Sequence, residues 1–187
     1  LLEINDFLDN LPDDILVFLD QAYYEYIEGS EFDIPFSLID DHPNLVISRS
    51  FSKAHGLAAL RLGFCVSNPE LSDYLNRVRQ PFNANSLALD LGKVALSDQE
   101  HISKSVKINS SGMDRVKKAF TNLDFNYIES WGNFISFDAK QDSDVAFQYF
   151  LEKGVILRSL KVYEMPKHLR VSIGTEEEMD FFLQVLE

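Results

Sequence analysis

Apolar residues follow two different patterns in the first part of the chain. Residues 1–12 carry them at three- and four-residue spacing, which predicts an amphipathic helix. Residues 15–19 and 44–49 contain short continuous apolar runs, typical of strands that are covered on both faces in a parallel sheet. A run at 60–67 predicts a third strand, and the Gly-, Pro- and acid-rich residues 28–43 predict a loop with one short helix. We therefore expect an α/β fold here.

The middle of the chain has the pattern of helices. Asn68 followed by Pro69 predicts a helix start, with asparagine as the N-cap and proline at the first position. An Ala- and Leu-rich pattern predicts another helix over residues 86–96, and a weaker pattern predicts a third over 98–121. The apolar residues expected on the inner side of the first of these helices are Leu71, Leu75 and Val78.

The last third of the chain alternates predicted strands with predicted helices. A helix over residues 143–153 is expected to end at Gly154, and Thr175 is expected to cap a final helix. These elements predict an α+β module with its helices on one side of a small sheet. We place the domain boundary between residues 95 and 96. The predicted strands are 125–130, 134–138, 155–158 and 168–174, and the residues expected to pack inward from the first helix are Val145, Ala146, Tyr149 and Phe150.

Composition narrows the possible partners. The chain of 187 residues has a formal net charge of −13, which argues against binding nucleic acid through a basic face or adsorbing to an anionic membrane. No apolar run approaches the ~20 residues that span a bilayer. The chain lacks an initiating Met and the basic start of a signal peptide, and we expect it to be an internal piece of a longer protein.

Cysteine and histidine usage indicates neither disulfides nor metal. Cys65 is the single cysteine, which fits a reducing, cytoplasmic location, and its apolar neighbours predict a buried, inert thiol. The four histidines show no metal-ligand spacing with Cys65 or with one another. His55 follows a lysine by two residues, and we expect a loop position for it.

Lys53 is the first candidate for chemistry. A lysine that follows a buried strand is partly desolvated, and its amine is then a better nucleophile toward carbonyl groups. Ser50, Ser52 and Arg61 offer two hydroxyl groups and a planar cationic fork, a set that suits a phosphate group. The alternative is an ordinary turn with a solvated lysine.

The stretch from Ser50 to Phe64, SFSKAHGLAALRLGF, resembles the lysine signature of fold-type I aminotransferases, and most of all that of histidinol-phosphate aminotransferases. These enzymes use pyridoxal 5'-phosphate (PLP). The resemblance implies that Lys53 binds the cofactor covalently and acts as the catalytic base, while Ser50, Ser52 and Arg61 anchor its phosphate. It also implies that residues 1–95 are part of the large PLP-binding domain, and residues 96–187 the small C-terminal domain.

Asp20 and Tyr23 are the second candidates. The stretch DQAYYEY from Asp20 resembles the Asp-Glu-Ala-Tyr motif of the same family, with Gln21 in place of Glu. By this resemblance, Asp20 holds the protonated ring nitrogen of PLP and Tyr23 contacts its 3'-oxygen. The separation from Lys53, 53 − 20 = 33 residues, leaves room for a crossover between parallel strands, which would bring both groups to one sheet edge. A cap after the strand for Asp20, and packing for Tyr23, are the alternatives.

Two arginines in the last third complete the candidate residues. The stretches LRVSIGT, with Arg170, and VILR, with Arg158, resemble the substrate-arginine segments of the family. The resemblance implies that they bind the phosphate of histidinol phosphate and the carboxylate of glutamate or 2-oxoglutarate. The alternative is that they are surface arginines. The family commonly continues with Glu-Glu-Asn after Gly-Thr, and the stretch Glu177-Glu178-Met179 departs from this pattern.

The resemblance covers nearly all of this chain but only about the C-terminal half of an aminotransferase. It implies transamination of histidinol phosphate and 2-oxoglutarate to imidazole acetol phosphate and glutamate, in a homodimer, and an isolated piece that is incomplete. Other PLP chemistry, such as threonine-phosphate decarboxylation or aromatic transamination, remains an alternative. A non-catalytic interaction domain with the same fold is an alternative of a different class.

Overall fold

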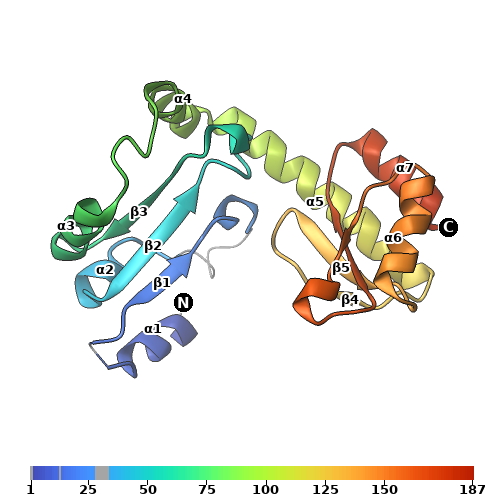
Figure 1. Ribbon diagram of the computed structural model, residues 1–187, viewed down its shortest axis with the longest axis horizontal. Coiled ribbons are helices and arrows are strands. Elements are labelled where there is room, and N and C mark those ends of the chain that lie inside the picture. The colour runs from blue at the N-terminus through green and yellow to red at the C-terminus, as the bar shows by residue number, and fades with distance from the viewer. Residues whose placement is uncertain (1, 13, 28–33) are drawn as a thin grey trace. The chain divides into compact units, whose positions relative to one another are not determined.

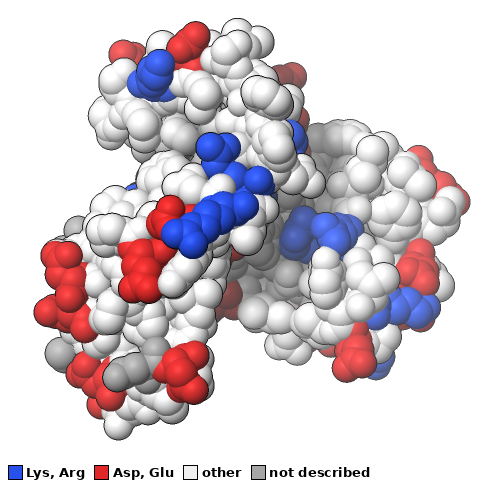
Figure 2. Space-filling view, turned by 60° about the vertical axis from the view of Figure 1, so that its left-hand side comes forward, with Lys and Arg blue, Asp and Glu red and all other residues white. Residues whose placement is uncertain are grey.

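The computed structural model describes residues 2–12, 14–27 and 34–187, and it divides into two compact units, Leu1–Ile102 and Ser103–Glu187 (Figure 1). Along the chain, the division between the units falls inside helix α5 (Gln99–Asn122). It lies seven residues (102 − 95) after the boundary placed from the sequence. The described helices include none that is long and apolar enough to cross a membrane. On the face presented in Figure 2, acidic side chains lie in several separate groups.

The first unit contains a three-stranded sheet in the order β1-β2-β3. Strand β1 (Val17–Asp20) pairs in parallel with β2 (Leu45–Ser50), and β2 pairs in antiparallel with β3 (Gly63–Ser67). The register places Asp20 opposite Ser48. The carboxyl ends of β1 and β2 therefore meet at one edge of the sheet, as the spacing of the two motifs predicted.

The larger of two core clusters in this unit lies on one face of the sheet. Helices α1 (Leu2–Asp9) and α2 (Leu38–Asp41) pack Leu8, Leu38 and Ile39 against Leu45 and Ile47 of the central strand. Residues 28–33 of the predicted loop lie outside the described residues, and α2 is the short helix expected after them.

Strand β1 differs from the prediction. It was expected to be covered on both faces, but its burial alternates, and Phe18 is 59% exposed. The reason is that Val17 and Leu19 point toward the core, while Phe18 points to the opposite face of the sheet.

Strand β3 lies at the opposite edge of the sheet, and this position also overturns a prediction. Cys65 was expected to be buried among apolar neighbours, but it is exposed, as are the adjacent Gly63 and Phe64. An apolar run in the sequence shows that a segment is a strand, but not how many neighbours the strand has.

Two helices follow β3, and both begin as predicted. The Asn68 side chain accepts from the backbone N–H of Leu71 at 2.9 Å and caps α3 (Pro69–Val78). The inner apolar stripe predicted for α3 is wrong, because none of its residues is buried and Val78 is 79% exposed. The principal neighbour of α3 is the edge strand β3, which covers too little of the helix to bury a side chain.

Helix α4 (Ser86–Ser97) packs close to the segment that contains Lys53. Its buried residues Ala88 and Gly92 face Phe51 and Leu62. A Cβ atom at Gly92 would lie 2.5 Å from the Cδ2 atom of Leu62, so the close approach of the helix requires glycine or a shift of Leu62. Helix α4 thus packs against Phe51, the first residue after β2.

The second unit is an antiparallel sheet in the order β4-β5-β7-β6, with its core on one face. Its strands are β4 (Tyr127–Ile128), β5 (Phe134–Asp138), β6 (Arg158–Ser159) and β7 (His168–Ser172), so the strand predicted over 155–158 is shorter and displaced. The three helices that cover this face are α5, α6 (Ser143–Glu152) and α7 (Glu176–Leu186).

Helix α6 packs through a narrower stripe than predicted. Ala146 and Phe150 are buried as expected, since residues four apart lie on one side of a helix. Val145 and Tyr149 were expected to pack inward too, and they are 60% and 49% exposed because they lie about a quarter turn away. The cap predicted at Gly154 is confirmed by its φ of +88°.

The start of helix α7 is also confirmed. Thr175 and Glu178 form a capping box, in which each side chain accepts a hydrogen bond from the backbone N–H of the other residue. Three glutamates occupy the first turn, as the sequence predicted for a final helix that begins at this threonine.

Candidate active site

Asp20 lies at the edge where the parallel strands β1 and β2 end. Its Oδ1 atom accepts from the backbone N–H of Ala22 at 3.0 Å and from the Oγ hydroxyl of Ser48 at 3.2 Å. The short helix that follows, η1 (Tyr24–Tyr26), has Tyr23 and not Asp20 at its N-cap. Asp20 therefore orders the turn after β1 and is linked by a hydrogen bond to the neighbouring strand β2. It does not serve as a helix cap.

Lys53 lies next to Tyr23. The Nζ atom of Lys53 is 4.8 Å from the centroid of the Tyr23 ring, a distance at which an ammonium group interacts with an aromatic face. Two buried residues anchor the turn that contains Lys53: Phe51 is 4% exposed and Ala54 is 1% exposed. Gly56 closes this turn with a φ of +71° and donates its N–H to the carbonyl of Lys53 at 2.9 Å.

The three residues predicted to hold a phosphate also lie together. The Oγ atom of Ser50 accepts from the backbone N–H of Ser52 at 3.0 Å. The Nη1 atom of Arg61 donates to Ser52 Oγ at 3.5 Å and to the carbonyl of Ala58 at 2.8 Å. Two hydroxyl groups and a guanidinium thus gather next to the turn of Lys53, a donor set that fits a phosphate group.

Arg49 of strand β2 contacts the turn that follows β1. The sequence analysis did not identify this residue. Its Nε atom donates to the Oε1 atom of Gln21 at 2.9 Å, and its Cζ atom lies 3.4 Å from the centroid of the Tyr24 ring. Gln21 is 8% exposed, so this amide is a buried acceptor that Arg49 satisfies. A charged residue near the end of a strand that begins fully buried was the available signal, since a partly buried guanidinium needs a partner.

His55 and Glu25 form a second contact between the two segments. The Nε2 atom of His55 is 3.6 Å from the Oε1 atom of Glu25, and the side chains are 9% and 13% exposed. Burial, followed by the nearby Glu25 carboxylate and Tyr23, raises the pKa of Tyr26 above its ordinary value of 10.0. Two polar contacts therefore join the turn after β1 to residues that precede and follow Lys53 in the sequence: Arg49 with Gln21, and His55 with Glu25.

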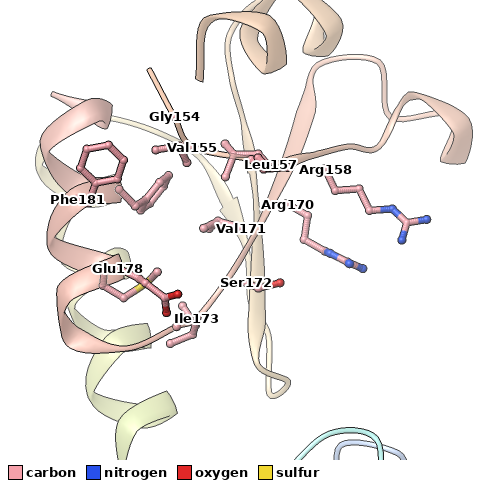
Figure 3. Close-up of a pocket in the computed structure, with 14 residues that line it drawn as sticks. Gly154, Val155, Leu157, Arg158, Arg170, Val171, Ser172, Ile173, Glu178 and Phe181 are labelled. Atoms are coloured by element: carbon pink, nitrogen blue, oxygen red, sulfur yellow. The ribbon is translucent and has the colours of Figure 1, made fainter. Parts of the chain in front are cut away.

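Arg158 and Arg170 lie opposite each other in the second unit, on the neighbouring strands β6 and β7. Both side chains extend to the same side, away from Phe181 and Glu178 of helix α7 (Figure 3). The Arg170 guanidinium carbon is 4.7 Å from the centroid of the Phe134 ring, and its buried Nε atom has no hydrogen-bond partner among the described residues. Like charges directly opposite each other destabilise a sheet, and an anion bound between them would offset this repulsion.

A cavity of about 470 Å³ adjoins these arginines on the helix side of the sheet. Its walls include Val155, Val171 and Phe182. The guanidinium groups point away from the apolar part of this cavity, toward the other face of the sheet (Figure 3).

Comparison with known proteins identifies the family of this chain. Residues 1–186 match the family model described as "Aminotransferase class I and II". The chain is 46% identical over 185 residues to histidinol-phosphate aminotransferase 1 of Nitrosococcus oceani, covering 99% of this chain and 50% of that protein. It is 48% identical over 180 residues to histidinol-phosphate aminotransferase 2 of Pseudomonas aeruginosa, covering 96% of this chain and 49% of that protein.

Solved structures show the same fold. The histidinol-phosphate aminotransferase of Sinorhizobium meliloti, in complex with pyridoxal-5'-phosphate, matches with a TM-score of 0.88 and 25% identity, over 98% of this chain and 51% of that one. L-threonine-O-3-phosphate decarboxylase of Porphyromonas gingivalis matches with a TM-score of 0.86 and 23% identity, over 99% of this chain and 57% of that one. The chain spans about half the length of the curated relatives it matches. Because the family model covers almost every residue, the chain belongs to the class I and II aminotransferases.

Proposed function

We propose that these residues act within a PLP-dependent aminotransferase that converts histidinol phosphate and 2-oxoglutarate into imidazole acetol phosphate and glutamate. When bound, PLP supplies an electron-withdrawing ring that stabilises negative charge on the substrate carbon. The observation that carries this proposal is the gathering of Asp20, Tyr23 and Lys53 where the parallel strands β1 and β2 end. The names of the similar sequences supply the substrate.

Each residue of this sheet edge has a role that follows from its chemistry. The Lys53 amine would hold the cofactor covalently and, when free, would carry a proton to and from the substrate carbon. Asp20, ordered by Ala22 and Ser48, would hold the ring nitrogen in its protonated form. The Tyr23 phenol would contact the 3'-oxygen. Since the Tyr23 ring lies beside the Lys53 amine, it also limits where that amine can move.

Ser50, Ser52 and Arg61 anchor the cofactor phosphate. The hydrogen bond from Arg61 to the Ala58 carbonyl fixes the guanidinium before the ligand arrives, so less side-chain entropy is lost on binding. Arg61 itself has a φ of +53°, a conformation unusual for a residue other than glycine. Such a conformation is retained when the surrounding structure fixes it, as the hydrogen bonds of this turn do.

Arg158 and Arg170 bind the acidic groups of the two substrates. A guanidinium fork matches a carboxylate or a phosphate with two parallel hydrogen bonds. The buried, unpartnered Nε of Arg170 supports this role, because such a donor gains most from an anion that satisfies it. The complete enzyme is proposed to be a cytoplasmic homodimer of chains about twice this length, as in the family that the motifs resemble.

The test is transamination by the full-length gene product that carries these residues. Lys53→Ala should lower kcat by about 10²- to 10⁴-fold, the usual contribution of a proton-transferring group. Lys93→Ala is the matched control, because the Lys93 side chain is 77% exposed on helix α4 and pairs with Asp90 on the surface. Full activity of Lys53→Ala would overturn the proposal.

The same assay separates the main alternative. A threonine-phosphate decarboxylase has the same fold, releases carbon dioxide and requires no 2-oxo acid. Carbon dioxide release from phosphothreonine, without a requirement for 2-oxoglutarate, would replace the aminotransferase proposal. Strict dependence on a 2-oxo acid supports transamination.

A further inference from the structure

Tyr163 lies beside Arg158 in the second unit. It ends the short helix η4 (Lys161–Tyr163), which follows strand β6 and is anchored by Leu160, a residue that is 6% exposed. The backbone N–H of Tyr163 donates to the Leu160 carbonyl at 2.9 Å, and Glu164 then reverses the chain with a φ of +61°. This turn brings the tyrosine back toward the strand that carries Arg158.

The contact between the two side chains is close. Arg158 Nη2 donates to Tyr163 Oη at 2.6 Å, and the guanidinium carbon lies 5.4 Å from the centroid of the tyrosine ring. Lys161, two residues earlier, is instead held by Asp142 at 3.1 Å and Asp144 at 2.7 Å. Tyr163 is therefore the residue of this turn that fixes the Arg158 fork.

The direction of this hydrogen bond determines whether the phenolic hydrogen of Tyr163 is still available as a donor. A guanidinium has only donors, so the phenol oxygen must be the acceptor in this contact. The phenolic hydrogen then points elsewhere and remains able to donate to an anion. Hydrogen bonding to a cation also polarises the O–H group and makes it a stronger donor.

The Arg158 fork and the Tyr163 hydroxyl together suit a phosphate monoester better than a carboxylate. One arginine fork already satisfies a planar carboxylate through two parallel bonds. A tetrahedral phosphate monoester presents three outer oxygens in different directions, and the phenol adds a donor outside the plane of the fork. Arg170, opposite Arg158 in the register, adds a second positive charge near a dianion.

We propose that Tyr163 is a specificity-determining residue that orients Arg158 and donates its phenolic hydrogen to the phosphate monoester of the substrate. The inference rests on the proposed function for the identity of the reaction, but phosphate recognition is measurable without turnover. Tyr163 acts on binding, and the chemistry at Lys53 does not depend on it.

The test compares Tyr163→Phe with the unchanged full-length protein, loaded with PLP so that the cofactor fills the Ser50, Ser52 and Arg61 site. Tyr163 is 56% exposed, so removal of one oxygen atom leaves the fold intact. The control is Tyr149→Phe, since Tyr149 is 49% exposed on α6 and its ring lies near Lys153, away from the arginines. The dissociation constant of inorganic phosphate is measured by titration calorimetry, and KM is measured separately for the phosphorylated amine and for the 2-oxo acid.

We expect Tyr163→Phe to weaken phosphate binding and raise the KM of the phosphorylated amine by about ten- to a hundredfold, the effect of a lost hydrogen bond to a charged group. The KM of the 2-oxo acid should rise less than that of the phosphorylated amine, because the Arg158 fork keeps both of its donors for a planar carboxylate. The kcat value, and all values for Tyr149→Phe, should change less than about twofold. Unchanged phosphate binding in Tyr163→Phe, equal losses for phosphate and 2-oxo acid, or no phosphate binding by the unchanged protein would each overturn the inference. Loss of PLP attachment at Lys53 would instead overturn the proposed function.

Discussion

The contact of Arg49 with Gln21 and Tyr24 should stabilise the turn that carries Asp20 and Tyr23. Arg49→Ala removes a hydrogen bond from a charged donor, worth about 1.5–3 kcal/mol, and a stacked cation–π contact, worth about 0.5–2 kcal/mol. It also leaves the buried Gln21 amide oxygen without this donor. The free energy of unfolding should therefore fall by about 2–4 kcal/mol.

The assay is a double-mutant cycle in urea with Arg49→Ala, Gln21→Ala and the combination of both. With a denaturant slope of about 2–3 kcal/mol/M, the single Arg49 variant should lower the urea midpoint by about 1 M. The two residues are in contact, so their coupling energy should be about 1–3 kcal/mol. Arg77→Ala is the control, because Arg77 is 66% exposed and pairs with Asp73 on the surface of α3; the expected change is below about 0.5 kcal/mol.

A coupling energy near zero would refute this reasoning. It would mean that the hydrogen bond between Arg49 and Gln21 does not contribute to stability, and that the turn after β1 is ordered by other contacts. Equal effects of Arg49→Ala and Arg77→Ala would lead to the same conclusion.

Three further predictions concern the second unit. Thr175→Ala removes the capping box with Glu178 and should lower stability by about 1 kcal/mol, measured by thermal unfolding, whereas Thr175→Ser should stay within a few tenths of the parent. Gly154→Ala should cost about 1–2 kcal/mol because the φ of +88° disfavours a Cβ atom; a variant as stable as the parent would contradict this. The backbone N–H of Asp144, followed by Lys161, lowers the pKa of Asp142 below 3.8, so its stabilising effect is present above about pH 4 and is lost as the pH falls through the lowered pKa. Asp142→Asn should therefore unfold with a weaker dependence on pH in that acidic range, and an unchanged acid transition would count against it.

The elements of the fold were largely predictable because their signals are local. Asn68 and Thr175 form the predicted caps, and Gly154 ends its helix as the sequence indicated. The parallel pairing of β1 and β2 followed from the spacing of their apolar runs, and it brought Asp20 and Lys53 to one edge of the sheet.

Burial was predicted less well, because it depends on neighbours that a local pattern does not specify. Phe18 and Cys65 stand in apolar runs of the sequence, and Val78 stands in an apolar stripe at helical spacing. They lie on edge strands or on a helix beside one. Arg49 and Tyr163 were missed for a related reason. Their partners, Gln21 and Arg158, become visible only when the strands and turns are assembled.

The central claim is that Lys53 forms the covalent bond to the cofactor, and one measurement tests it most directly. The full-length gene product is incubated with PLP and reduced with borohydride, and the modified peptide is identified by mass spectrometry. We predict a single stable modification at Lys53, absent from Lys53→Ala and retained in Lys93→Ala. A modification of the same yield in Lys53→Ala, or one at another lysine, would contradict the claim.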